Sequence, residues 1–373
     1  MVRSLLPFAA AWLFASALSP LAAEIVPSAR LEANASIPSA ADGSAADFAG
    51  IARISLDSAK NDAIKGRVSF SLADTSGSKP VENQLALEQA WIKTRFPWIT
   101  ENSSLRLTAG KAPLSWGRGF LYNAGDPVFG AVPETISPGT GEYRTATDWL
   151  ASLYLPLGDF SFAEFLALPY ENAGAGARLF FTPELGALHS IEASYLAREA
   201  ETVSAAHTAS LSADGTIWAD WYASASLSAP FETSPAPENM TGRISGGVFR
   251  MFSPPAVESL SFRLEALYIP ASLSDFENAH LYGYASIQTA FDELWSVAAQ
   301  TVITRTAGIG AGEADTAENR AVFFPKSTIA SLIVTFTPIK GFSMNTGMAA
   351  MDMPSLSFDD KGLVYTLGFT ASF

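Results

Sequence analysis

The chain has 373 residues, of which 48% are hydrophobic and 16% are charged, and its 37 Asp and Glu residues outnumber its 23 Lys and Arg residues. This acidic balance disfavours nucleic-acid binding, which needs a basic surface to neutralise phosphates. The chain has no cysteine and 3 histidines, which excludes a disulfide scaffold, a thiolate metal site and a cysteine nucleophile, and disfavours structural zinc.

Residues 1–23 have the pattern of a secretory signal peptide. A cation at Arg3 precedes a mostly apolar run over residues 5–18, and two small residues end at Ala23. The run is too short for a membrane-spanning helix, which needs about 18 apolar residues or more. We therefore expect cleavage after Ala23 and a single domain over residues 24–373.

The rest of the chain reads as segments in which apolar and polar residues alternate. Val68, Phe70 and Leu72 alternate with Ser69 and Ser71, for example. Side chains of a strand point to alternate faces. Most segments have about 9 to 12 residues, near the length that a tilted strand needs to cross a bilayer, whereas soluble strands are nearer five or six. The predicted strands are 25–37, 47–58, 64–73, 85–96, 104–111, 147–156, 159–169, 175–182, 188–198, 203–213, 216–229, 242–253, 259–269, 279–291, 294–305, 327–338, 340–352 and 362–373.

The connections between these segments alternate in length in the second half of the chain. Short turns are expected at Leu157-Gly158-Asp159, Asp214-Gly215, Asp292-Glu293 and Ile339-Lys340-Gly341. Long connections are expected at 112–146, 230–241, 306–326 and 353–361. Barrels of the outer membrane have short periplasmic turns and long outer loops, so this parity indicates an even strand count of eighteen. Sixteen strands remain the alternative, in which a weak hairpin such as 175–198 is a loop.

The last segment alternates along its whole length and ends on an aromatic residue. Leu363, Tyr365, Leu367 and Phe369 fall on one side, and the chain stops at Phe373. This ending resembles the closing strand of bacterial outer-membrane β-barrels. The resemblance implies that the outer-membrane assembly machinery recognises the C-terminal strand as a partner. Strand parity brings Phe373 to the same side as the start of the first strand at Ile25, so we expect the two strands to pair and close the barrel.

The longest predicted loop opens with an unusual stretch, Gly110 to Phe129. It resembles a Trp-Gly-x-Gly-x-x-x-Asn-x-x-Asp pattern of several porin-like outer-membrane families. The matching residues are Trp116, Gly117, Gly119, Asn123 and Asp126. The resemblance implies a loop that folds inward and narrows a pore, with Arg118 and Asp126 as candidate constriction charges. The alternative is a loop structured by its turns and aromatic residues, without a role in selecting solutes.

Charged residues also lie on the polar phase of several strands, which would face the lumen of a barrel. They are Arg30, Glu32, Lys65, Arg67, Lys93, Arg95, Arg106, Arg263 and Glu265. A cation-lined wall would favour anions. The alternative, and the more common outcome, is that these residues pair with each other or with loop carboxylates. Aromatic residues on the same phase could form a sugar surface, but such residues more often belong to the interface girdles or pack under a loop. They are Trp91, Trp218, Tyr222, Tyr282 and Tyr284.

The sequence offers little support for catalysis. His189, His207 and His280 are spread over separate segments, and neither a G-x-S-x-G nor an H-E-x-x-H motif is present. We expect no enzymatic activity, no cofactor and no metal.

Together these patterns predict an all-β protein, a transmembrane antiparallel up-and-down β-barrel of about eighteen strands in the outer membrane. The expected function is porin-like passive diffusion, with outer-membrane lipid and small solutes as partners and the oligomeric state open. Candidate pore or constriction residues are Trp116, Arg118, Asn123, Asp126, Arg106, Lys93 and Arg95. Alternatives are a structural or adhesive surface barrel with partner-binding loops, a barrel hydrolase, and a soluble periplasmic β-protein.

Overall fold

The computed structural model describes residues 25–38, 47–58, 63–75, 85–97, 104–133, 146–170, 173–183, 185–199, 206–231, 236–308, 322–351 and 363–372. The predicted signal peptide, residues 1–23, and the terminal Phe373 lie outside these residues. No helix of the described chain is both long and apolar enough to span a membrane.

The described chain is almost entirely β-structure, with one short 3-10 helix, η2 (Pro237–Asn239). The strands are β1 (Ile25–Pro38), β2 (Asp47–Ser58), β3 (Ile64–Thr75), β4 (Leu85–Pro97), β5 (Ser104–Pro113), β6 (Thr147–Gly158), β7 (Ser161–Leu168), β8 (Gly174–Phe181), β9 (Leu188–Arg198), β10 (Ala206–Thr216), β11 (Asp220–Pro230), β12 (Thr241–Phe252), β13 (Ser259–Ser272), β14 (Asp275–Ala290), β15 (Trp295–Gly308), β16 (Val322–Ile339), β17 (Phe342–Met351) and β18 (Leu363–Ser372).

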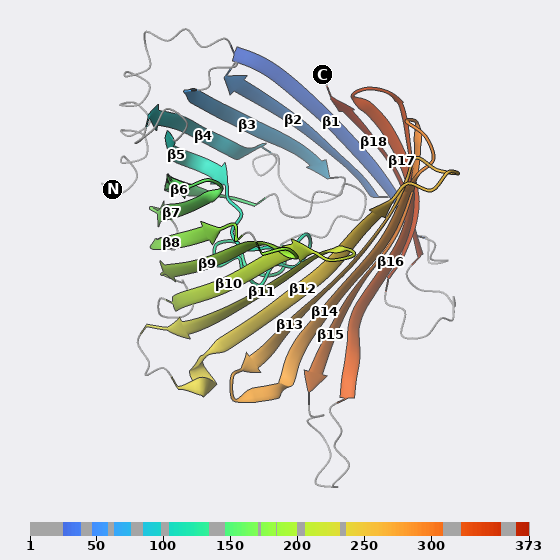
Figure 1. The fold of residues 1–373 in the computed structure, drawn as a ribbon. Helices are drawn as coiled ribbons and strands as arrows, with labels where there is room; N and C mark the ends of the chain where they lie inside the picture. Colours follow the sequence, from blue (N-terminus) through green and yellow to red (C-terminus); the bar gives the residue numbers. More distant parts are fainter. Residues whose placement is uncertain are drawn as a thin grey trace.

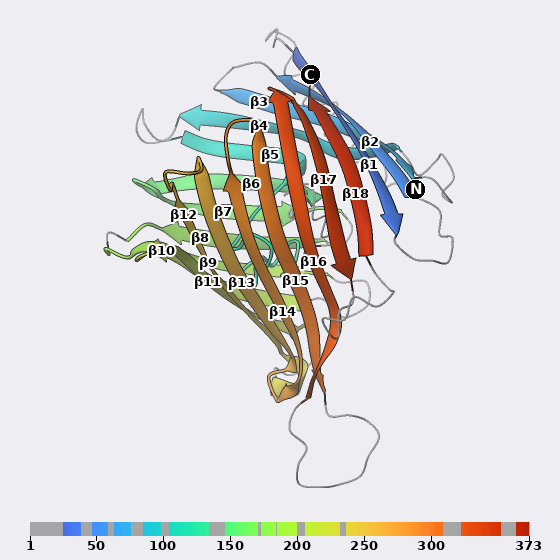
Figure 2. The same ribbon diagram turned by 90° about the vertical axis from the view of Figure 1, so that its right-hand side faces the viewer.

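Each strand pairs antiparallel with its neighbours in sequence, and the last strand pairs with the first (Figures 1 and 2). The closing register runs from Arg30 opposite Ser372 to Pro38 opposite Val364. Closure leaves no open sheet edge, which is the condition for a β-sheet in lipid. The predicted all-β, up-and-down barrel of eighteen strands is confirmed.

The sixteen-strand alternative is wrong. The segment that it treats as a loop, 175–198, contains most of β8 and all of β9. These two strands pair from Gly174 opposite Arg198 to Phe181 opposite Ile191. Each also pairs with its outer neighbour, β7 or β10. The hairpin is therefore part of the wall.

The two faces of the wall differ in polarity. On β3, Val68, Phe70 and Leu72 are exposed on the outer face, while Ser69 and Ser71 point inward and are buried. Other exposed large apolar residues of the outer face include Leu153, Phe165, Leu179, Leu227, Ile244, Leu264, Ile287, Leu332, Met348, Leu367 and Phe369. An apolar outer band with a polar interior is the arrangement of a barrel in a bilayer.

The two ends of the barrel differ in their connections. At the end where β1 begins and β18 ends, here called the terminal end, strands are joined by short turns such as 159–160 and 340–341. At the opposite end, here called the loop end, the connections include 114–146 between β5 and β6. Which end faces the cell exterior stays a prediction.

Predicted boundaries are wrong by several residues at three connections. The connection expected at 306–326 is shorter, because β15 ends at Gly308 and β16 begins at Val322. Asp214-Gly215 is not a turn but the end of β10, and the turn is at 217–219, which includes Trp218. A Cβ on Gly215 would lie 1.9 Å from the Ala187 carbonyl oxygen, so this glycine permits a close approach at a bulge in the β9–β10 pairing. The connection between β13 and β14, expected at 270–278, is a tight turn at 273–274.

Candidate functional site

Residues 114–133, here called the in-folded segment, leave β5 and lie inside the barrel (Figure 1). Hydrogen bonds connect the segment to each successive strand of the inner wall from β7 to β14. Trp116, Leu121 and Tyr122 are fully buried against this wall. The segment is therefore packed like a protein core, and its course agrees with the inward fold that the sequence resemblance implied.

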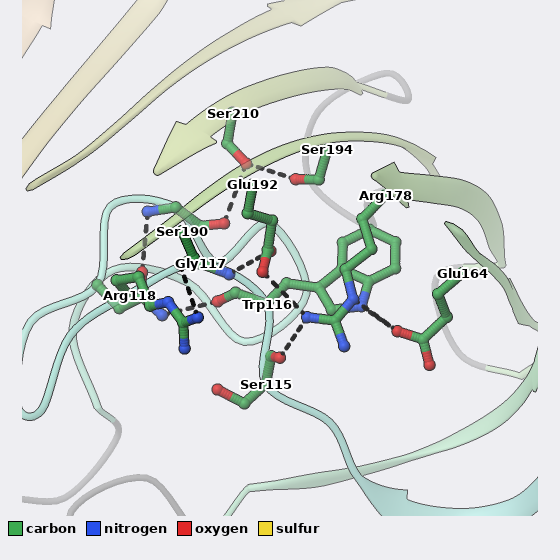
Figure 3. A network of polar contacts seen from close by, with 12 residues as sticks. Ser115, Trp116, Gly117, Arg118, Glu164, Arg178, Ser190, Glu192, Ser194 and Ser210 are labelled. Atoms are coloured by element: carbon green, nitrogen blue, oxygen red, sulfur yellow. Dashed lines mark hydrogen bonds and ion pairs between the residues drawn. The ribbon is translucent and has the colours of Figure 1, made fainter. Parts of the chain in front are cut away.

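Trp116 is fixed beside a partly buried cation, Arg178, that lies between two carboxylates (Figure 3). The Trp116 indole N–H donates to Glu164 Oε2 at 3.1 Å, and Arg178 Nε donates to the same oxygen at 2.7 Å. Arg178 Nη1 also donates to Glu192 Oε2 at 3.2 Å and to the Ser115 carbonyl at 2.9 Å. Buried charges are tolerated only when they are paired and hydrogen-bonded. The wall and the segment complete each other's polar contacts.

Arg118 is held against strands β9, β10 and β11 of the wall. Its Nη2 donates to Ser190 Oγ at 2.9 Å (Figure 3). Its Nε lies 2.7 Å from Asp214 Oδ1. The Ser224 hydroxyl donates to the Arg118 carbonyl at 2.9 Å. Arg118 and Asp214 line a cavity of about 400 Å³ beneath the segment. Arg118 is partly exposed there, and its charge is balanced locally.

Glu265 on β13 anchors the middle of the segment. Its carboxylate accepts the backbone N–H groups of Phe120 at 3.2 Å, Leu121 at 2.8 Å and Tyr122 at 3.1 Å. Three successive backbone donors that converge on one carboxylate form a concave anion site. The Arg263 guanidinium stacks on the Phe120 ring at 3.5 Å. The charge of Glu265 is thus compensated inside the barrel.

Tyr122 lies in an apolar cluster with Leu267, Tyr284 and Val302. Burial raises the pKa of the Tyr122 phenol well above its usual value, so the ring stays neutral. Its ring lies 5.7 Å from that of Tyr282. The predicted polar-phase aromatics Tyr282 and Tyr284 therefore pack under the segment, which is one of the three interpretations that the sequence allowed.

The remaining motif residues shape the segment itself. Asn123 donates from Nδ2 to the Trp116 carbonyl at 2.7 Å and accepts the Gly125 N–H at 3.0 Å. Asp126 Oδ1 accepts the backbone N–H groups of Val128 and Phe129 at 3.0 and 3.1 Å. Such side-chain bonds to nearby backbone groups stabilise turns. They hold the segment in its compact form.

Gly117 is the motif glycine with the clearest steric reason. Its φ is +73°, a conformation that L side chains rarely adopt, and an added Cβ would lie 2.6 Å from Asn123 Oδ1. Its N–H donates to Glu192 Oε1 at 2.6 Å. The motif therefore encodes a folded and anchored segment.

The burial of three candidate residues bears on their predicted pore role. Trp116 and Asn123 are 0% exposed and Asp126 is 1% exposed, so none of the three faces open lumen. This favours the alternative in which the stretch is structural, while a constriction role for Arg118 stays a prediction. The other three candidates, Lys93, Arg95 and Arg106, lie on β4 and β5.

Sequence reasoning missed the anchoring residues Glu164, Arg178 and Glu192. On β7 the inward residues Leu166 and Leu168 are apolar because they pack against the segment, which obscures the alternation that marks an inner face. On β9 the inward residues Ser190, Glu192 and Ser194 are polar, so a buried carboxylate there was visible as the polar phase. The segment residue that contacts this carboxylate, Gly117, could not be identified from the sequence.

A cavity of about 910 Å³ lies on the other side of the segment, along the inner wall of β1 to β6. Val128 and Phe129 form the segment's side of it. Most of the opposite side is polar or charged. Its charged lining residues are Arg30, Arg53, Arg67, Glu88, Lys111, Asp148 and Arg198. The segment thus fills one side of the barrel and leaves a polar space at the other.

Several cations of this cavity have acidic partners, but of the polar-phase cations listed from the sequence only Arg67 is among them, and its partner Asp57 lies on a strand and not in a loop. Arg53 forms an ion pair with Glu88, and Arg67 Nε lies 2.6 Å from Asp57 Oδ1. Arg198 Nη2 lies 2.9 Å from Asp148 Oδ2. The Arg67–Asp57 pair joins adjacent strands, whereas Arg53–Glu88 joins β2 to β4 and Arg198–Asp148 joins β9 to β6. They reduce the fixed positive charge of this part of the lumen.

The structure also places the histidines. His189 and Asp214 both line the smaller cavity, and His207 contacts Tyr195 and Phe231. Among the described residues, no group of three or more His, Asp or Glu side chains is arranged to hold a metal ion.

No protein-family model matches the chain, and no curated protein matches its sequence. Solved structures of similar fold are those of bacterial outer-membrane porins. Acinetobacter baumannii OccAB4 is 10% identical with a TM-score of 0.52, over 94% of this chain and 98% of that one. Pseudomonas aeruginosa OccK11 (OpdR) is 11% identical with a TM-score of 0.52, over 94% and 95%. Pseudomonas aeruginosa OccD3 (OpdP) is 10% identical with a TM-score of 0.50, over 94% and 91%. At these identities the similarity shows the fold, which is that of bacterial outer-membrane β-barrels.

Proposed function

We propose that this chain is a channel of the bacterial outer membrane through which small solutes diffuse passively. The observation that carries the proposal is the polar cavity of about 910 Å³ between the in-folded segment and the wall of β1 to β6. A barrel of eighteen strands encloses more space than its own side chains fill. The apolar outer face of the same strands suits lipid.

The in-folded segment supports this function by its position. It packs against β7 to β14 and is anchored by the buried carboxylates Glu164, Glu192 and Glu265. A segment fixed in this way narrows the lumen without moving freely across it. Solutes would pass along the opposite wall. A surface barrel that serves only to bind partners has no need of this polar space.

Single-channel recording on refolded protein in a planar bilayer tests the proposal. Circular dichroism and heat-dependent gel migration would first establish that the barrel has folded. We expect discrete conductance steps in potassium chloride at low voltage. A folded barrel that conducts no ions at any voltage would contradict the channel function and leave the fold unaffected.

A further inference from the structure

Four cations lie together on the inner face of the wall near the terminal end. Lys65 on β3 is directly opposite Lys93 on β4, and Arg95 on β4 is directly opposite Arg106 on β5. Directly opposed residues of an antiparallel pair have close Cβ atoms, and like charges at such positions are destabilising. Two adjacent pairs of this kind lie on three neighbouring strands. The fold therefore holds a repulsive arrangement that some other group must offset.

All four side chains point into the barrel. Arg106 on β5 is directly opposite Tyr154 on β6, and Tyr154 is directly opposite Glu164 on β7. The Glu164 carboxylate accepts a hydrogen bond from the in-folded segment inside the lumen. Residues opposite each other share a face, so Arg106 also faces inward. Lys65 and Arg95 are exposed, which means that solutes in the lumen can reach them.

Among the described residues, no carboxylate forms an ion pair with any of these four cations, although Glu164 acts on Lys93 electrostatically from a longer distance. The contrast with the neighbouring wall is direct, because Arg53 and Arg67 on β2 and β3 each have an acidic partner. Arg106 stacks on the Tyr154 ring at 4.4 Å, and its buried Nε has no hydrogen-bond partner. The chain as a whole carries a formal charge of −14. The local excess of cations is therefore not a general property of its surface.

We propose that Lys65, Lys93, Arg95 and Arg106 form a binding site for small oxyanions on their way through the channel. The inference rests on the channel function proposed above and names the class of solute. Two guanidinium groups offer forked N–H donors that match carboxylate or phosphate oxygens, and two ammonium groups add point charges. An anion at this site supplies the charge that the wall lacks. When the site is empty, the fixed charges attract anions and repel cations.

The test compares ion selectivity and anion block in the intact barrel. The double variant Lys93→Gln/Arg95→Gln removes two charges of the site. The control variant Arg250→Gln/Lys340→Gln removes the same charge from the outward face of β12 and from the turn after β16. Both variants must fold, as judged by heat-dependent gel migration. Reversal potentials are then measured in a potassium chloride gradient.

We expect anion selectivity in the natural and the control proteins, and a shift toward cations in the site variant. Inorganic phosphate and succinate serve as probes of current block. The half-blocking concentration should rise at least about tenfold in the site variant, since that is the effect of one lost charge-assisted hydrogen bond. Block by phosphate alone assigns the site to phosphate-bearing solutes, and block by succinate alone assigns it to carboxylates.

The failure of this inference differs from failure of the channel function. Absence of any conductance in a folded barrel contradicts the channel. Conductance without anion preference, or with no block by either probe, or with equal block in both variants, overturns the oxyanion site and leaves the channel in place.

Discussion

The carboxylate of Glu265 on β13 accepts the backbone N–H of Leu121 at 2.8 Å, although the two residues are 144 positions apart in the chain. This bond and its neighbours attach the in-folded segment to the far side of the barrel from its own strands. The polar cavity lies on the side that the segment leaves free. The position of the polar cavity thus depends on where wall carboxylates meet segment N–H groups.

Replacing Glu265 with Gln should loosen the segment. A carboxamide has one acceptor oxygen and one donor group, so at least one of the buried N–H groups of Phe120, Leu121 and Tyr122 loses its partner. An unsatisfied buried donor costs about 1 to 3 kcal/mol, and we expect the free energy of unfolding in urea to fall by that amount. Single-channel current should also become noisier. Glu258→Gln, at an exposed turn residue, is the control and should change neither property.

Gly117 and Gly130 provide a matched pair of substitutions. Both have a positive φ, of +73° and +82°, but a Cβ at Gly117 would meet the Gly125 backbone at 2.6 Å, whereas one at Gly130 meets nothing within 4 Å. Gly117→Ala should therefore destabilise the protein by about 1 to 3 kcal/mol more than Gly130→Ala. Urea unfolding of the two variants measures the difference. Equal losses would show that the segment does not pack at Gly117 as described.

The lipid-facing assignment of β18 can be tested with an introduced charge. Leu367 is exposed on the outer face, and its neighbour Thr366 points to the opposite side. An arginine on the lipid face near the bilayer midplane costs about 2 to 4 kcal/mol. We expect that loss for Leu367→Arg refolded in lipid vesicles and little change for Thr366→Arg. Equal stability of the two variants would contradict the assignment of the outer face.

The natural chain contains no cysteine, so a single introduced thiol reports its own environment. Ser55 lines the polar cavity, and the adjacent Leu56 is exposed on the outer face. A charged, water-soluble thiol reagent should react with Ser55→Cys and lower its single-channel conductance. Leu56→Cys in a bilayer should not respond. A reagent that modifies Ser55→Cys without any change in current would show that ions take another route.

The sequence could predict the strands of the wall because the polarity of a strand's two faces is visible in the alternation of its neighbouring residues. Alternation at Val68 to Leu72 and along Tyr365 to Phe369 depends only on neighbours two residues apart. The ends of the strands were harder to predict. In the sequence, Gly215 has the appearance of a turn residue, but in the structure it lies at a bulge in the β9–β10 pairing. The tight turn at 273–274 also carries no glycine or proline.

The candidate site was predicted only in part, because its contacts join distant parts of the chain. The motif from Trp116 to Asp126 marked a segment with a definite shape, yet its partners Glu164, Glu192 and Glu265 lie on three separate strands. The sequence also could not show which lumen cations have an acidic partner. Arg67 is neutralised by Asp57 through cross-strand register, whereas Lys93 faces Lys65.

By itself, then, the sequence determined the strand period and the polarity of each face, both of which follow from local spacing, whereas the inward fold of the loop after β5 was only implied by a family resemblance. The tertiary structure alone decided which side of the barrel this loop covers and which lumen cations have partners. The physical reason is register: closing eighteen strands fixes every cross-strand neighbour at once, and electrostatic pairing depends on those neighbours and not on the order of residues along the chain.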